Sequence, residues 1–480
     1  MPRDLTPAAA LLILTAGLAA PAEAGSPIRS AASLKRKQER IEKNLVRDHL
    51  RLVKKLQRAD RPFEAWLELK QVLRIDPENR KALAEIPQYP PPPPVESLKD
   101  YAAARGRIDK EATRELGELI ERGEKGKLSS EDLTPVAMRL LEYELDHEGA
   151  RRVLGFTGAP QDWVSAAEAK RQAAFKAAFE KAPTGEEVPG AFPKLAAALG
   201  VKLTVRKTPH AFVAGVNASA DKLDSVAKSV ETAWAAIHHD LFGGTELFGD
   251  GDGRAATGVK LKPLAPPLFL VLDDKAQHLR FLDKVVTDKN LKVRGRSLGF
   301  LATNWAPERV LICESRTPGM HLVEWSSMLM THIVINQRFG RNRPVFLKQS
   351  LARYYSGLVS GRAYVKMVAS GTQSDGPGGA TRGDYNQLRW LARWAYARFR
   401  ALAPSSEGLR RPLDAIRRTD LAVGTAWVDY LLSRHRAKLI ALLKLADSKK
   451  IGTSEAFAKA VAPDPMAFDS GFVDWLVKNL

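Results

Sequence analysis

The stretch that decides the fold is EWSSMLMTHIVINQRFGRNRPVFLKQSLARYYSG, residues 324–357. Its first half places apolar side chains at mostly three- and four-residue steps, which is the spacing of one face of an α-helix. The residues that set this spacing are Trp325, Met328, Leu329, His332, Ile333 and Ile335. The second half reads as a buried helix that begins after a basic turn. The stretch therefore predicts a helix, a short loop and a second helix.

This predicted pair resembles the active-site helices of the gluzincin-type zinc metallopeptidases, the peptidase MA-like group. In that family the first helix carries His-Glu-x-x-His. The second helix typically reads Pro-x-Trp-Leu-x-Glu-Gly-Leu-Ala-x-Tyr, and its Glu is the third zinc ligand. Here the first motif falls on residues 328–332 and the second on residues 344–354. The positions that match the second motif are Pro344, Leu347, Leu351, Ala352 and Tyr354, with an aromatic kept at Phe346.

At the positions where the resemblance implies zinc ligands and a general base, this sequence mostly carries residues that can do neither job. Catalytic zinc needs three protein ligands, a water and a nearby carboxylate that takes the proton of that water. Met328 stands at the first ligand position, where a thioether is a poor zinc ligand. Leu329 at the general-base position cannot accept a proton, and neutral Gln349 stands at the third ligand position. Only His332 is left, so the sequence predicts no metal, no cofactor and no catalytic residue here.

Other histidines do not rebuild the metal site. His321 lies eleven residues before His332, about 16 Å along a helix, so the two cannot share one ion. We expect His321 and Glu324 to be solvated or to cap the helix, and His332 to be a partly buried, hydrogen-bonded imidazole. His238 and His239 end another predicted helix, and adjacent residues point to different sides.

The altered pocket is expected to bind rather than to cleave. We predict that Met328, His332, Gln349, Arg353 and Tyr354 line it. Gln349 replaces a carboxylate and Arg353 adds a cation, so the pocket would suit an anionic group such as a peptide C-terminus. Alternatively, Arg353 points to solvent. The leading hypothesis is a catalytically inactive peptidase-like protein that binds a peptide, a protein partner or an envelope polymer.

Two other functions stay open on the sequence. An active zinc peptidase with a non-standard site would carry about one zinc ion per chain. A protein that binds an anionic polymer is suggested by the net charge of +19 and the sequence pI near 9.8. The basic N-terminal helices have no interleaved aromatic residues and no nucleic-acid motif appears, so nucleic acid is not an expected partner.

The first 24 residues read as a secretory signal. Arg3 gives a charged start, residues 8–20 form an apolar run, and Ala22-Glu23-Ala24 is a cleavage site. The run of 13 residues is short for a membrane span, although an uncleaved anchor is the alternative, and no later stretch is predicted to span a membrane. We therefore expect export to the periplasm, the cell envelope or the medium. Cys313 is the only cysteine, which excludes an internal disulfide and suggests a buried, inert thiol.

The remaining chain is expected to be mainly helical, with an α+β domain at its C-terminal end. Residues 30–86 read as helices, and FEAWLELKQVLRIDPENRKALAEI within them resembles part of one tetratricopeptide repeat. Residues 87–98 form a Pro-rich linker, residues 99–200 a further helical region, and residues 201–480 the peptidase-like domain with a small mixed sheet and a helical C-terminal lobe.

Several elements can be placed from periodicity. Residues 201–243 read as strand, strand and long helix, LFLVL at 268–272 as a buried strand, and residues 309–312 as another strand. Helices are predicted at 166–181 and 425–445. Residues 30–61 contain eleven Lys and Arg against four Asp and Glu. This basic surface is either a solvated helix face or a contact for an anionic polymer or membrane headgroups.

Overall fold

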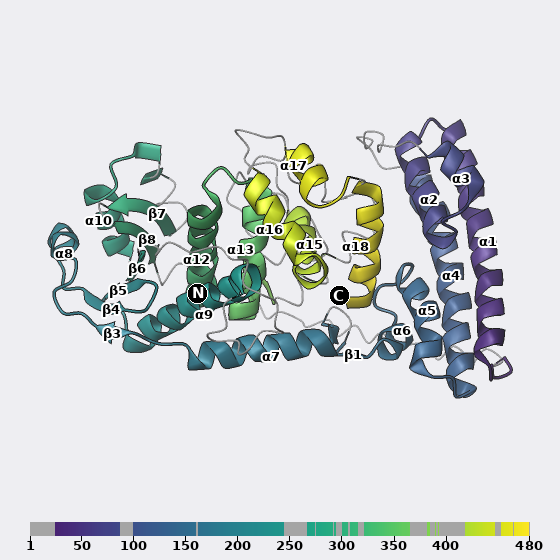
Figure 1. Cartoon of the computed structure of the whole chain (residues 1–480), viewed down its shortest axis with the longest axis horizontal. Helices are drawn as coiled ribbons and strands as arrows, with labels where there is room; N and C mark the ends of the chain where they lie inside the picture. The colour runs from purple at the N-terminus through teal and green to yellow at the C-terminus, as the bar shows by residue number, and fades with distance from the viewer. Residues whose placement is uncertain are drawn as a thin grey trace, which may run out of the picture.

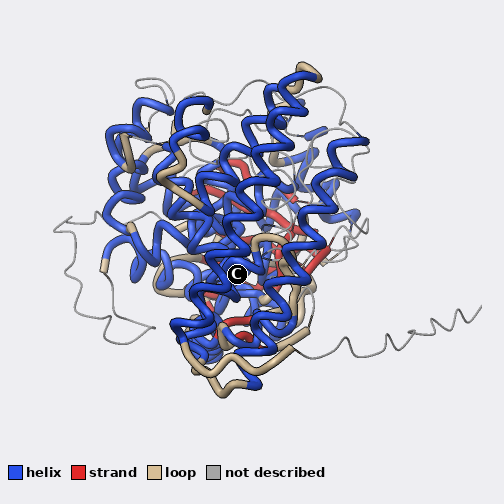
Figure 2. Tube along the Cα trace, turned by 90° about the vertical axis from the view of Figure 1, so that its right-hand side faces the viewer, coloured by secondary structure: helices blue, strands red, loops and turns tan. Residues whose placement is uncertain are grey.

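Three parts follow one another along the longest axis of the molecule (Figure 1). A helical bundle forms one end, a sheet with its covering helices forms the other, and a helical lobe lies between them. Seen from the bundle end, the strands lie behind the helices (Figure 2). The computed structural model describes residues 25–86, 99–159, 162–243, 266–273, 275–290, 292–293, 300–305, 308–314, 321–364, 382–384, 389, 392, 418–446, 453–463 and 465–479.

Six helices build the N-terminal bundle. They are α1 (Ala31–Arg58), α2 (Pro62–Ile75), α3 (Arg80–Glu85), α4 (Lys99–Lys125), α5 (Ser130–Leu141) and α6 (Glu148–Val153). Small polar residues begin several of them: the Ser30 hydroxyl accepts from the Ser33 N–H, and Ser129 and Asp132 form a capping box at α5. Helix α1 packs on both α2 and α4. Its buried His49 contacts Glu68 of α2 across 2.6 Å, and Arg105 of α4 donates to the same carboxylate at 2.8 Å.

A long helix connects the bundle to the rest. The short antiparallel pair β1 (Phe156–Thr157) and β2 (Val164–Ser165) leads into α7 (Ala166–Lys181). Helix α7 begins at the Ser165 cap, whose hydroxyl accepts from the Glu168 N–H, and it runs along one side of the molecule toward the sheet (Figure 1). The predicted helix at 166–181 is therefore confirmed.

The sheet is mixed, with the order β3-β4-β5-β6-β8-β7. The strands are β3 (Glu186–Glu187), β4 (Thr204–Lys207), β5 (Phe212–Val216), β6 (Leu268–Leu272), β7 (Phe300–Trp305) and β8 (Glu308–Glu314). The central strands β5, β6 and β8 are parallel, and the outer strands run antiparallel to their neighbours. Strand β6 is buried along its whole length, as its uninterrupted apolar sequence predicts for a strand covered on both faces.

Successive side chains of β6 enter different cores. Phe269 and Val271 join the core formed with α9 (Ala220–Phe242) and the helical lobe. Leu268, Leu270 and Leu272 join the core beneath α8 (Pro193–Leu199) and α10 (Lys275–Lys284). This alternation is the two-residue period of a strand, and it fixes which face of the sheet the lobe covers.

The helical lobe contains the two helices predicted from residues 324–357. Its elements are α12 (Leu322–Phe339), α13 (Val345–Ser360), β9 (Arg362–Tyr364), β10 (Arg382–Asp384), α15 (Arg418–Arg434), α16 (Arg436–Leu445), α17 (Thr453–Ala460) and α18 (Pro465–Asn479). Helix α13 lies against both α12 and α15. Gly424 of α15 permits a close approach, because a Cβ there would lie 2.2 Å from Ser350 Oγ and 2.6 Å from the Phe346 ring.

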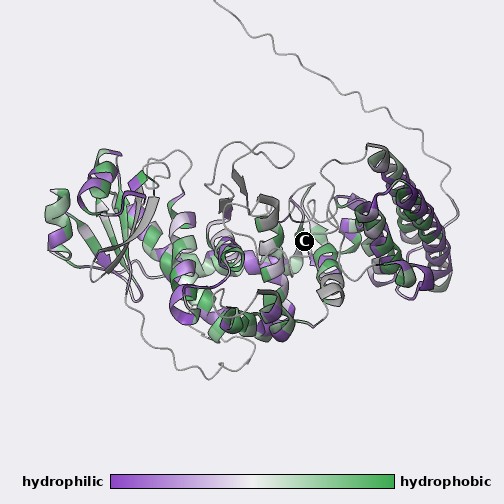
Figure 3. Cartoon of the chain, turned by 90° about the horizontal axis from the view of Figure 1, so that it is seen from above, coloured by the Kyte–Doolittle hydropathy of each residue, from purple (hydrophilic) through white to green (hydrophobic). Residues whose placement is uncertain are grey.

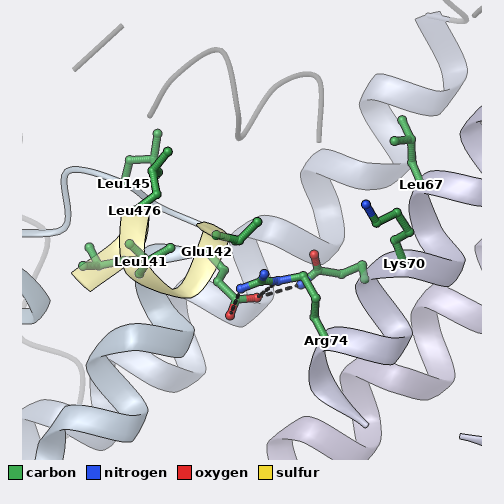
Figure 4. Close-up of a pocket in the computed structure, with 10 residues that line it drawn as sticks. Leu67, Lys70, Arg74, Leu141, Glu142, Leu145 and Leu476 are labelled. Atoms are coloured by element: carbon green, nitrogen blue, oxygen red, sulfur yellow. Dashed lines mark hydrogen bonds and ion pairs between the residues drawn. The ribbon is translucent and has the colours of Figure 1, made fainter. Parts of the chain in front are cut away.

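The last helix joins the lobe to the bundle. Val473 and Val477 of α18 enter the apolar core of the bundle. At this junction Arg74 of α2 donates to Glu142 at 2.9 Å (Figure 4). Arg74 also donates to Asp474 of α18 at 3.2 Å. The described structure thus places the C-terminal helix against helices from the first third of the chain.

The prediction of a mainly helical α+β chain is confirmed. The strands at 268–272 and 309–312 and the order strand, strand, helix within 201–243 are also confirmed. The single helix predicted at 425–445 is wrong, because α15 ends at Arg434 and α16 begins at Arg436. The backbone leaves the helical conformation at His435, whose ring bonds the Tyr430 hydroxyl at 3.0 Å. The predicted signal at 1–24 and linker at 87–98 lie outside the described residues.

None of the helices in the described part of the chain is both long enough and apolar enough to cross a bilayer.

Replacing Gly424 by Ala should lower the free energy of unfolding by about 1–3 kcal/mol, because the new methyl group overpacks the contact between α13 and α15. Urea denaturation measures the change. Gly106→Ala in α4 is the matched control, since a Cβ at Gly106 meets nothing within 4 Å and should stabilise the helix by about 0.5–1 kcal/mol. Equal stability of the Gly424 variant and the natural protein would contradict the close approach.

Glu142 should make the stability of the junction depend on pH. Burial alone would raise the pKa of Glu142, but Arg74 and Arg139 beside it lower the pKa to about 2. A carboxyl whose pKa is lower in the folded chain stabilises it above its unfolded pKa, and this contribution is lost as the pH falls from about 5 to about 2. The contribution of Glu142 is about 3 kcal/mol at neutral pH.

Urea denaturation of Glu142→Gln and of the natural protein at several pH values measures this contribution. The difference in unfolding free energy should be large at pH 7 and shrink steadily toward pH 3. Glu144→Gln removes an exposed carboxylate from the same turn and should change stability little at either pH. If the difference in unfolding free energy between Glu142→Gln and the natural protein did not change with pH, the charge of Glu142 would not be the source of its stabilising effect.

Candidate functional site

Helices α12 and α13 form an antiparallel hairpin. His321 begins α12 by accepting the Glu324 N–H on its Nδ1, which confirms the predicted capping role. Gly340 ends α12 with a φ of 98°, and Pro344 stands immediately before α13. In the turn, Arg343 donates to the Phe339 carbonyl at 2.5 Å and to the Ala446 carbonyl at 2.7 Å. These bonds hold the hairpin against the end of α16.

The hairpin brings two of the five predicted pocket residues into direct contact. Arg353 Nη1 of α13 lies against Met328 Sδ of α12, and the two side chains are in the interior. Met328 is 7% exposed and Arg353 is 4% exposed. The alternative in which Arg353 points to solvent is therefore wrong. Its charge instead lies between the two helices.

His332 and Gln349 follow one helical turn away on the same two helices. His332 is four residues after Met328 and Gln349 is four residues before Arg353, so each shares a helix face with its neighbour in that contact. Because the hairpin is antiparallel, the two turns lie level with each other. Both residues are half-buried. His332 and Gln349 therefore lie one helical turn from the contact between Met328 and Arg353.

The residues of this hairpin do not fit a catalytic zinc ion. Zinc would meet a thioether at Met328, an alkyl group at Leu329, one imidazole at His332 and an amide at Gln349. The guanidinium of Arg353 adds a positive charge beside the first of these positions. Among the residues that the structure describes, no group of three His, Cys, Asp or Glu could hold a metal ion.

Tyr354 belongs to a different side of α13. Its hydroxyl accepts a hydrogen bond from Arg171 Nη1 of α7 at 3.0 Å, and the Arg171 guanidinium lies 5.6 Å from the centre of its ring. Arg171 Nη2 also donates to Asp429 Oδ2 of α15 at 2.7 Å and contacts Glu168 one turn back. Glu168 is reached in turn by Arg389 across 2.6 Å.

This ion cluster joins α7, α13 and α15 and balances its own charge. Burial alone would lower the pKa of Arg171, but Asp429 and Tyr354 raise it well above its ordinary value, so the guanidinium stays charged. Glu168 and Asp429 are buried carboxylates, and two guanidiniums neutralise them. A buried charge that is fully paired is expensive to disturb. We therefore assign the cluster to positioning Tyr354 rather than to binding an anion.

A cavity of about 300 Å³ lies beside Tyr354. Its walls are Arg171, Ala174, Phe175, Ala236, His239, Asp240, Tyr354, Leu432 and Ser433. The walls come from α7, α9, α13 and α15, so the cavity lies where these four helices meet. Tyr354 is the one predicted pocket residue among them.

A second group of histidines is structural. His210, Trp234 and His238 stack face to face, with ring centres 3.4 Å and 3.8 Å apart, and Glu231 accepts from His210 at 2.7 Å. Burial, followed by the charges of Arg338 and His210, lowers the pKa of His238 to about 4, so this ring is neutral at pH 7. His239 instead contacts Asp240, which confirms that the adjacent histidines diverge.

The residues that sequence reasoning missed are Arg171 and Asp429. Arg171 lies in a helix whose sequence is rich in Ala and Lys, and Asp429 is 258 positions further along the chain. Helix and strand periodicity relate only residues that are close in sequence, so it could not connect these two. Of the residues in this cluster, the sequence pointed only to Tyr354. No family model matches the chain, and no curated protein sequence matches it.

Proposed function

We propose that this chain is an exported, non-catalytic peptidase-like protein that binds a peptide or a protein partner. The observation that carries the proposal is the contact between Met328 and Arg353 inside the α12–α13 hairpin. What supports the proposal is that α12 and α13 follow one another as the two motif helices of the gluzincin-type enzymes do. Met328 stands at the first ligand position of that motif, and Arg353 lies against it. A protein that keeps these helices and has lost the ion can still bind a peptide or a protein partner elsewhere on the same helices.

The positive charge of Arg353 is the physical reason why the proposed function includes no bound zinc ion. A divalent ion roughly 4 Å from a guanidinium would be repelled by about 8 kcal/mol at an effective dielectric constant of about 20. A single imidazole and an amide do not offset a repulsion of that size. The positive charge of Arg353 and the loss of carboxylate ligands therefore act in the same direction.

The cavity beside Tyr354 is the surface we assign to the ligand. Its volume of about 300 Å³ lies at the lower end of ligand pockets, which suits one side chain or a small group. Phe175 and Leu432 provide apolar contact, and Asp240 and Ser433 are polar groups on the same walls. This mixture favours a protruding side chain of a peptide or protein partner over a polymer of uniform charge.

Metal analysis tests the proposal. After dialysis against zinc and then buffer, the natural protein should hold less than about 0.1 zinc per chain by mass spectrometry of the metal. The triple variant Met328→His, Leu329→Glu, Gln349→Glu should bind zinc weakly because Arg353 is still present. Adding Arg353→Met should raise the content toward about one zinc per chain.

Lys348→Met in the triple variant is the matched control. It removes one positive charge from the same helix, where Lys348 Nζ donates to the Arg341 carbonyl in the turn. Zinc content should stay near that of the triple variant. About one tightly held zinc per natural chain would overturn the proposal, and equal binding by the triple and quadruple variants would show that Arg353 does not exclude the ion.

A further inference from the structure

Helix α1 carries a line of exposed positive charge. Seven basic side chains recur at steps of three or four residues and therefore share one face, called here the basic stripe. The basic stripe consists of Arg36, Arg40, Lys43, Arg47, Arg51, Lys54 and Arg58, all of them exposed. The buried side chains of the helix, including Leu45, Leu52 and Leu56, lie on the opposite face. The helix is therefore apolar toward the bundle and cationic toward solvent.

The charge of the basic stripe is poorly compensated. Of the described residues, Asp48 alone lies within ion-pairing distance of any member, at 3.1 Å from Arg51 and 3.8 Å from Arg47. The neighbouring helix α4 is built differently, because its exposed Arg114 pairs with Glu111 and Glu118 at helical spacing. An ordinary solvated helix face shows the pattern of α4. Among the described residues, Arg51 is the one member of the basic stripe with such a pair, to Asp48 three residues before it.

The position of α1 decides which partner the stripe fits. The helix forms the outer edge of the bundle, and hydrophilic residues cover that side (Figures 1 and 3). The stripe runs about 33 Å along this outer edge, so a flat surface can touch its whole length. Single-stranded nucleic acids are held in positive grooves with aromatic side chains for stacking. The stripe offers neither a groove nor an aromatic residue.

We propose that the basic stripe of α1 holds the protein against an anionic membrane surface. The contact is electrostatic, since no apolar side chain on the stripe could enter the lipid. Each Lys or Arg near an anionic bilayer strengthens binding by roughly fivefold, and the attraction fades within about 8 Å at physiological salt. The proposal is independent of the ligand of the peptidase-like lobe.

Vesicle binding of the chain from Gly25 onward tests the stripe, because the apolar run before Gly25 could insert by itself. We expect binding to vesicles of equimolar phosphatidylcholine and phosphatidylglycerol, and none to phosphatidylcholine alone. Arg40→Gln, Lys43→Gln and Lys54→Gln together should weaken binding roughly a hundredfold. Arg40→Lys, Lys43→Arg and Lys54→Arg keep the charge and should bind like the natural chain.

Arg107→Gln, Lys110→Gln and Lys125→Gln form the matched control, because they remove three exposed charges from α4. This variant should bind within about threefold of the natural chain, since its charges lie off the stripe. An equal loss in both Gln variants would overturn the proposal in favour of net charge alone. Binding to a soluble polyanion such as heparin without binding to the anionic vesicles would overturn it in favour of a linear polymer.

Discussion

The close packing of α12 between α9 and α13 is the constraint on which the rest of the structure depends. Helix α12 is buried on nearly every side, so its polar side chains need partners inside the protein. Ser326, Ser327 and Thr331 meet this need by donating to carbonyls of their own helix at 2.6, 2.6 and 2.8 Å. Ser326 also contacts Ser229 of α9, and Phe339 stacks on Phe242. These three hydroxyl groups are therefore satisfied inside the apolar core.

Under the proposed peptidase-like origin, that packing gives a physical reason why a metal site could be lost while the two helices are kept. Met328 and Arg353 lie in contact between α12 and α13. The flexible thioether of Met328 can fill irregular space, and the aliphatic stem of Arg353 can pack against apolar neighbours. Removing ligands alone would leave a polar hollow, which costs stability. Filling the hollow with a long side chain restores the packing, and the charge that it brings opposes any later return of a cation.

The sequence could predict what depends on local spacing. The hairpin, the strand LFLVL and the cap at His321 are each decided by residues within a few positions of one another. The break at His435 was missed because apolar spacing continues from α15 into α16, while the turn is set by a ring contact with Tyr430. The cluster around Arg171 was missed for a different reason. Arg171 meets Tyr354 and Asp429 only after three distant helices have packed, so no local pattern announces it.

Helix α18 packs the lobe against the bundle. Val473 and Val477 place a lobe helix in the bundle core, and Arg74 bonds both Asp474 of that helix and the half-buried carboxylate of Glu142. The bundle is therefore packed against the lobe as well as linked to it by α7. Helix α7 runs across the direction of α1 (Figure 1), so a surface that meets α1 along its length leaves the lobe and the sheet extending away from it. A bilayer on the outer edge of the bundle would not cover the cavity beside Tyr354, which lies beyond α18 in the part of the molecule that stays in water.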